Sequence, residues 1–153
     1  HNWWRAAHTS VYDTDTRALI EKLKDFVDVN NARLLWQRAI NSKWGRAPVW
    51  VHGDVASSNL LVKDNRLAAV IDFGCMGIGD PACDLTIAWT FFRGESREIF
   101  RENMRLDEET WSRARGWAMW KALYEISELE DKSGAALAKQ RMIIDSVIAE
   151  TCS

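Results

Sequence analysis

The sequence has little of what builds disulfide frameworks, membrane spans or nucleic-acid surfaces. Its three cysteines form no C-x-x-C pair and are odd in number, which argues against a disulfide scaffold and favours a reducing, cytoplasmic setting. The longest apolar runs are too short to cross a bilayer, so we expect no membrane partner. Lys and Arg total 20 against 22 Asp and Glu. Because there is no basic excess to hold a polyanion, we expect no nucleic-acid partner.

What the chain does contain is enough apolar material for one folded unit. Its 153 residues are 47% hydrophobic and include nine tryptophans, so a real core is expected. A tryptophan is a core residue as often as it is a platform for a ligand, and the count therefore does not select a function. We find no internal repeat and no Gly/Ser linker, and we expect residues 1–153 to form a single domain.

Hydrophobic spacing predicts a mostly helical α+β fold. Apolar residues recur at intervals of three and four over 16–27 and 34–40, and helical patterns also cover 107–131 and 135–150. Asp80 followed by Pro81 is a strong helix start, ahead of an apolar stretch to residue 92. Short apolar runs at 49–51, 59–62 and 67–73, with turn residues at 63–66, predict strands and a hairpin. We therefore expect helices over 1–48, a hairpin segment over 49–74 and helices over 75–153.

Three oxygen-bearing side chains flank the predicted hairpin. Asp54 and Asn59 precede its first strand, and Asp72 lies at the end of its second. A tight turn would bring Asp72 back towards Asn59, gathering an amide oxygen and two carboxylates in one volume. Hard oxygen ligands suit Mg²⁺, which takes its remaining ligands from water and phosphates. The chemistry indicated is phosphoryl transfer from a nucleotide, in which Asn59 and Asp72 would hold the metal and Asp54 would orient or accept the proton of an attacking hydroxyl.

An ordered set of motifs carries a resemblance to a known family. His-Gly-Asp at 52–54 has Asn59 five positions after its Asp, Ile-Asp-Phe-Gly at 71–74 places its Asp thirteen positions after that Asn, and Gly-Asp-Pro at 79–81 is followed by Asp84. These spacings resemble the aminoglycoside phosphotransferase family, which is kinase-like and related to choline and fructosamine kinases. The resemblance implies an ATP- or GTP- and Mg²⁺-dependent O-phosphotransferase, acting on the hydroxyl of an aminoglycoside or a similar antibiotic or metabolite.

The same resemblance implies a role for each matching position. Asp54 corresponds to the catalytic aspartate, and Asn59 and Asp72 correspond to the metal ligands. His52 is expected to support the loop. Asp84 is expected to brace the backbone of the catalytic loop without touching the substrate.

Kinase-like enzymes hold the nucleotide beneath an amino-terminal lobe with a Gly-rich loop and a lysine. Only 48 residues precede Val49 here, and they read as helices without a Gly-rich loop. We therefore expect the chain to be the carboxy-terminal lobe alone, inactive by itself: either a fragment, or a lobe whose nucleotide-binding partner is another chain. The face left uncovered would be apolar and could drive self-association.

The substrate is not readable from the sequence. Glu125 and Glu128 lie in an acidic stretch that could bind a polyamine sugar, and Trp120 belongs to an aromatic stripe that could line a pocket. A solvated helix face and a buried core stripe are the competing interpretations. The alternative function is a non-catalytic module, derived from the same lobe, that binds a small molecule or a protein.

Overall fold

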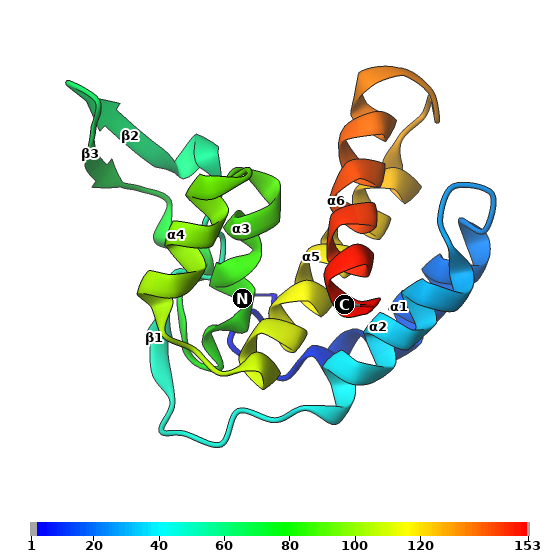
Figure 1. Cartoon of the computed structure of the whole chain (residues 1–153), viewed down its shortest axis with the longest axis horizontal. Helices are drawn as coiled ribbons and strands as arrows, with labels where there is room; N and C mark the ends of the chain where they lie inside the picture. The colour runs from blue at the N-terminus through cyan, green and yellow to red at the C-terminus, as the bar shows by residue number, and fades with distance from the viewer. Residues whose placement is uncertain (1–2, 153) are drawn as a thin grey trace.

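The computed structural model describes residues 3–152, without the side chain of Cys152, and it has the mostly helical α+β architecture that the sequence predicts. The helices and strands lie as in Figure 1. In chain order they are η1 (Thr9–Tyr12), α1 (Asp13–Lys22), α2 (Val29–Asn41), β1 (Val49–Val51), η2 (Ser57–Asn59), β2 (Leu60–Lys63), β3 (Arg66–Val70), η3 (Phe73–Cys75), β4 (Gly77–Gly79), η4 (Pro81–Thr86), α3 (Ile87–Thr90), α4 (Glu95–Met104), α5 (Glu108–Glu128) and α6 (Gly134–Cys152), where η marks a 3₁₀ helix.

Helix α5 is the centre of the core. It packs against α2, α6 and η4, and its inward side chains are almost fully buried. Its start is fixed by Asp107, whose carboxylate accepts a hydrogen bond from Thr110 N at 2.8 Å, as an N-cap residue does. At Gly116 the neighbouring helix is so close that a Cβ would lie 2.6 Å from Ala39 Cβ. The sequence predicted this helix with nearly the observed bounds.

The predicted helix over 16–27 is shorter than expected. Helix α1 ends at Lys22, and the chain then turns through Phe26 N, which donates to Leu23 O. Helix α2 begins immediately after Asp28, whose carboxylate accepts from Asn31 N at 3.1 Å. The break between the two helices is therefore set by a capping aspartate a little before the asparagine pair that suggested it.

Two antiparallel two-stranded sheets are present where the sequence predicted one hairpin. Strands β2 and β3 form that hairpin, with Leu60 opposite Val70, and its turn residues Asp64 and Asn65 have φ of 51° and 58°, as a tight hairpin turn requires. Strand β1 does not join them: it pairs with β4, which the sequence did not predict. In Figure 1 the β2–β3 hairpin projects away from the helices α1, α2, α5 and α6.

The segment after β4 also differs from expectation. The predicted helix over 80–92 is a 3₁₀ turn, η4, followed by the single short helix α3, and α4 then adds a helix that the sequence did not predict. Asp80 caps η4 by accepting from Ala82 N. It also forms a buried ion pair with Arg113 of α5, with 2.6 Å between Oδ2 and Nε. Asp80 therefore ties η4 to the core as well as capping it.

The strand surface carries large exposed apolar side chains. Trp50 and Ile78 lie opposite each other in the β1–β4 ladder and expose 68% and 56% of their surface, and Phe73 and Met76 between the sheets are also exposed. Within residues 3–152 no helix combines the length and the apolar character needed to span a bilayer.

Candidate active site

The loop at residues 52–59 is held by hydrogen bonds to a side chain of η4. The carboxylate of Asp84 accepts two backbone hydrogen bonds, from His52 N to Oδ2 and from Gly53 N to Oδ1, each 2.7 Å long. Carboxylate acceptors make the stronger class of hydrogen bond, and both donors belong to buried residues. One side chain thus fixes the direction in which the chain leaves β1.

His52 connects this loop to the loop at residues 71–75. Its Nδ1 accepts from Asp54 N at 3.2 Å, and its Nε2 lies 2.9 Å from Ile71 O. Since a carbonyl only accepts, the two contacts together assign the proton to Nε2 of a neutral imidazole. The ring also packs against Phe73, with centroids 4.6 Å apart. His52 therefore positions the residues on either side of Asp72.

The two loops also touch through their backbones. Gly53 has φ of +84°, and a Cβ on it would lie 2.2 Å from the carbonyl oxygen of Cys75. Only glycine combines that conformation with that approach. In addition, Ile71 N donates to Asn59 O at 3.0 Å, which extends the β2–β3 ladder to the residue before Asp72.

Asn59 and Asp72 present their oxygens differently. Asn59 is buried and its Nδ2 donates to Asp54 O at 2.9 Å. Among the described residues, its Oδ1 has only a 3.5 Å contact from Ser58 Oγ. Asp72 is exposed and has a left-handed backbone, with φ of 64°. These are hard oxygen donors of the kind that suits Mg²⁺. Among residues 3–152 no group of three or more His, Cys, Asp or Glu side chains is placed to hold a metal ion.

Asp54 faces helix α5, where it forms an ion pair with Lys121. The distance between Oδ1 and Nζ is 2.9 Å, and each side chain is about one third exposed. Burial by itself would raise the pKa of Asp54, but the hydrogen bond and charge of Lys121, helped by the charge of Arg5, lower that pKa below its ordinary value. Asp54 is therefore ionised at neutral pH.

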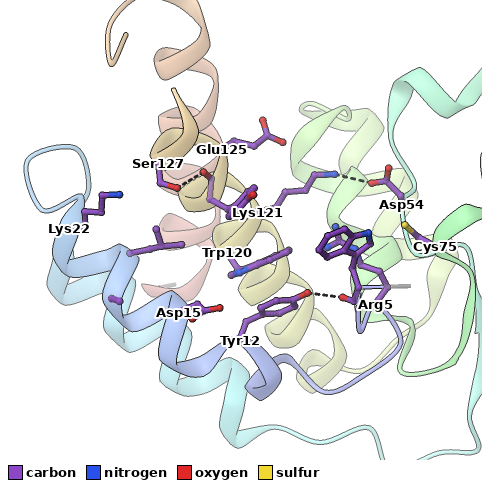
Figure 2. Close-up of a pocket in the computed structure, with 14 residues that line it drawn as sticks. Arg5, Tyr12, Asp15, Lys22, Asp54, Cys75, Trp120, Lys121, Glu125 and Ser127 are labelled. Carbon is purple, nitrogen blue, oxygen red and sulfur yellow. Dashed lines mark hydrogen bonds and ion pairs between the residues drawn. The ribbon is translucent and has the colours of Figure 1, made fainter. Parts of the chain in front are cut away.

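A pocket of about 770 Å³ opens beside this ion pair. Figure 2 shows Asp54 and Lys121 directed towards each other at one end, with Trp120 and Tyr12 further along. The 3–12 segment contributes to the wall because Asp80 N donates to Ala6 O, which places Arg5 at the pocket. The lining residues are Trp3, Arg5, Tyr12, Asp15, Ala18, Leu19, Lys22, Asp54, Cys75, Trp120, Lys121, Tyr124, Glu125 and Ser127.

The substrate residues suggested by the sequence divide at this pocket. Trp120 and Glu125 line it, whereas Glu128 is exposed and does not. Trp120 is nevertheless 92% buried, because it stacks on Tyr12 with centroids 4.1 Å apart. It therefore belongs both to the core and to the pocket wall.

Sequence reasoning missed Lys121, which directly contacts Asp54. The available signal was its position, next to Trp120 and one helical turn before Glu125. That spacing places it on the helix face that carries the other candidates. It does not reveal that the lysine turns towards the 52–59 loop.

The structure thus places the carboxylate of Asp54, in the 52–59 loop, beside a pocket large enough for a small-molecule substrate. The profile of the phosphotransferase enzyme family (APH) matches residues 2–117, and the chain belongs to that family. This confirms the resemblance carried by the motifs of residues 52–84. Searches of curated proteins and of solved structures found no match to the chain.

Proposed function

We propose that this chain is the carboxy-terminal, substrate-side lobe, with a kinase-like fold, of an O-phosphotransferase that transfers the terminal phosphoryl group of ATP or GTP to a hydroxyl of a small molecule. The observation that carries the proposal is the position of Asp54. It stands at the end of a pocket large enough for a drug-sized ligand, on a loop fixed by Asp84 and joined by His52 to the 71–75 loop.

The donor set supports Mg²⁺ as the ion that accompanies the nucleotide. Asn59 Oδ1 and the Asp72 carboxylate would hold it, and the remaining ligands would be phosphate oxygens and water, because Mg²⁺ in nucleotide sites usually takes only one or two protein carboxylates. The Nδ2 of Asn59 is already used by Asp54 O, which favours the amide orientation that presents an oxygen to a cation. When bound, the ion would neutralise charge on the phosphates during transfer.

The residues of this chain have distinct tasks in such a reaction. Asp54 accepts the proton of the substrate hydroxyl as the oxygen attacks phosphorus. Lys121 keeps Asp54 ionised, His52 holds both loops at a fixed separation, and Asp84 fixes the backbone beneath Asp54. Because phosphoryl transfer depends mainly on positioning and charge, these supporting contacts are as important as the base.

The exposed strand surface supports the presence of a second lobe in the active enzyme. Trp50 and Ile78 form an apolar pair on the β1–β4 sheet, next to the 71–75 loop where a nucleotide would bind. Covering this surface would bury side chains that are costly to leave in water. We propose that a nucleotide-binding lobe packs there, supplied by another part of the protein or by another chain.

The test uses the full-length protein, with phosphoryl transfer from labelled ATP or GTP to a panel of hydroxyl compounds as the readout. Asp54→Asn should lower turnover by roughly 10²–10⁴-fold while nucleotide affinity is retained, because only the proton acceptor is lost. Asp72→Asn should abolish the Mg²⁺ dependence of nucleotide binding measured by calorimetry.

Asp64→Asn is the matched control, since this exposed aspartate lies in the hairpin turn, where asparagine tolerates the same left-handed backbone. It should leave both measurements unchanged. Full turnover of Asp54→Asn would refute the catalytic assignment. A pocket that binds small molecules in a protein that never binds nucleotide would favour the non-catalytic module.

A further inference from the structure

Two of the three carboxylates that line the pocket, Asp54 and Glu125, already have partners within the chain. Asp54 is paired with Lys121 at 2.9 Å. Glu125 accepts a hydrogen bond from Gln140 Nε2 through Oε2. A cationic ligand would compete with these internal partners for the two carboxylates, which lowers what it gains by binding them.

The aromatic wall is occupied in the same way. The guanidinium carbon of Arg5 lies 5.1 Å from the centroid of the Trp120 ring, within the range of a cation–π contact. Tyr12 stacks on Trp120 with centroids 4.1 Å apart, and Tyr124 continues the series at 6.2 Å. The Trp120 ring is therefore already in contact with the Arg5 guanidinium and with the Tyr12 ring. An incoming ammonium would have to compete with Arg5 for it.

The charges of the lining also balance. The lining holds three carboxylates (Asp15, Asp54 and Glu125) and three cationic side chains (Arg5, Lys22 and Lys121), so its formal net charge is zero. A polyammonium sugar is best bound where carboxylates are in excess. The rest of the lining is mainly aromatic and aliphatic, which favours the apolar faces of a ring system.

The ion pair is well suited to a neutral hydroxyl. Within residues 3–152, Lys121 donates one hydrogen bond, to Asp54 Oδ1. Two of the three N–H donors of Lys121 therefore remain available, and Asp54 Oδ2 has no partner among these residues. A hydroxyl both donates and accepts. It can donate to Oδ2 and accept from Nζ without breaking the pair.

We propose that the pocket selects uncharged, ring-containing alcohols over amines and polyamines, with the reacting hydroxyl bound between Asp54 and Lys121. This proposal rests on the proposed function, in which Asp54 accepts the proton of the reacting hydroxyl. In the transfer step the hydroxyl oxygen forms the new bond to the terminal phosphorus, the bond from that phosphorus to the bridging oxygen breaks, the nucleoside diphosphate leaves with the electron pair, and the proton passes to Asp54.

The test is calorimetric binding to the full-length protein without nucleotide, using naphthylethanol, naphthylethylamine and kanamycin as probes. The first two share a ring system and differ in charge, and the third is a polyammonium sugar. Naphthylethanol should bind at least about tenfold more tightly than the amine. Tighter binding of the amine or of kanamycin to the wild type would overturn the proposal.

Lys121→Met removes the internal cation and should reverse the preference, because Asp54 would then lack a counter-ion and accept the amine. Lys121→Arg keeps the charge and should retain the wild-type order. Lys63→Met, an exposed lysine on β2 outside the pocket, is the matched control and should change nothing. An unchanged preference in a folded Lys121→Met protein, verified by circular dichroism, would refute the role of the ion pair.

Tyr124→Ala tests the aromatic wall, because this side chain is 49% exposed and lines the pocket. It should weaken naphthylethanol binding, whereas Phe91→Ala, equally exposed but outside the pocket, should not. Binding of the neutral probe that is insensitive to Tyr124→Ala would overturn the proposal.

A failure of the proposed function would give a different result. Turnover would not depend on Asp54, or nucleotide would not bind, while the ratio of alcohol to amine affinity would stay as proposed. Conversely, Asp54-dependent phosphorylation of kanamycin in preference to ring alcohols would refute the substrate class and leave the phosphotransferase intact.

Discussion

Replacing Asp84 by alanine should destabilise the protein far more than the loss of an average surface carboxylate. The carboxylate accepts two short backbone hydrogen bonds, from His52 N and Gly53 N, and both of these residues are buried. A buried donor left without its acceptor costs about 1–3 kcal/mol, and part of the loss is recovered where water enters. For the two donors together we expect a loss of about 3 kcal/mol in the free energy of unfolding. In a domain of this size that corresponds to a fall in Tm of roughly 6–12 °C.

Urea denaturation followed by circular dichroism measures this loss, and thermal melting gives the second estimate. Asp84→Asn keeps one acceptor oxygen but directs an NH₂ donor at a backbone donor, so its stability should fall between wild type and Asp84→Ala. Glu128→Ala is the control, because this glutamate is exposed on the same protein, and surface changes usually stay within about 0.5 kcal/mol. If Asp84→Ala were as stable as Glu128→Ala, Asp84 would not hold the 52–59 loop.

Two further predictions concern the ion pairs. Arg113→Met should lower the free energy of unfolding, measured by urea denaturation, by about 3–5 kcal/mol, because it leaves Asp80 charged and buried. Adding Asp80→Asn should restore part of that loss. A loss below about 1 kcal/mol would contradict a stabilising role for the buried pair. The lowered pKa of Asp54 predicts that the stability lost in Lys121→Met is fully present above the ordinary carboxyl value of 3.8 and disappears as the pH falls through the lower pKa of the folded protein. With both side chains one third exposed, that loss should be under about 1 kcal/mol at neutral pH, and a loss that instead grew on acidification would refute the assignment.

The long helices were predictable because their apolar spacing and caps agree. For α5 the cap at Asp107 and the buried stripe point to the same start, and the observed end lies three residues before the predicted one. Helix α4 was missed because its only apolar residues are Ile99, Phe100 and Met104, which are too few to give a repeated helical spacing. Strand β4 was missed because Gly77 and Gly79 have poor strand propensity, and only pairing with distant β1 makes the segment extended.

The candidate site was predictable to the extent that it lies in one continuous motif. The sequence suggested that Asn59 and Asp72 approach across a hairpin, and the observed register continues to Ile71 N and Asn59 O. It could not indicate Lys121, Arg5 or Tyr12, because these come from helix and N-terminal segments far from the motif. Contacts of that kind depend on how α5 packs, which hydrophobic spacing does not specify.

Helix α5 packs into the core with one face and lines the pocket with another, and this affects how substrate specificity can evolve. One face is committed to the interior through residues such as Met119, Leu123 and Ile126. The other borders the pocket through Tyr124 and Ser127, neither of which is fully buried. Mutational drift on the second face can reshape what the protein accepts while the scaffold keeps its stability, so a random library confined to those two codons would sample new acceptors at little risk of unfolding.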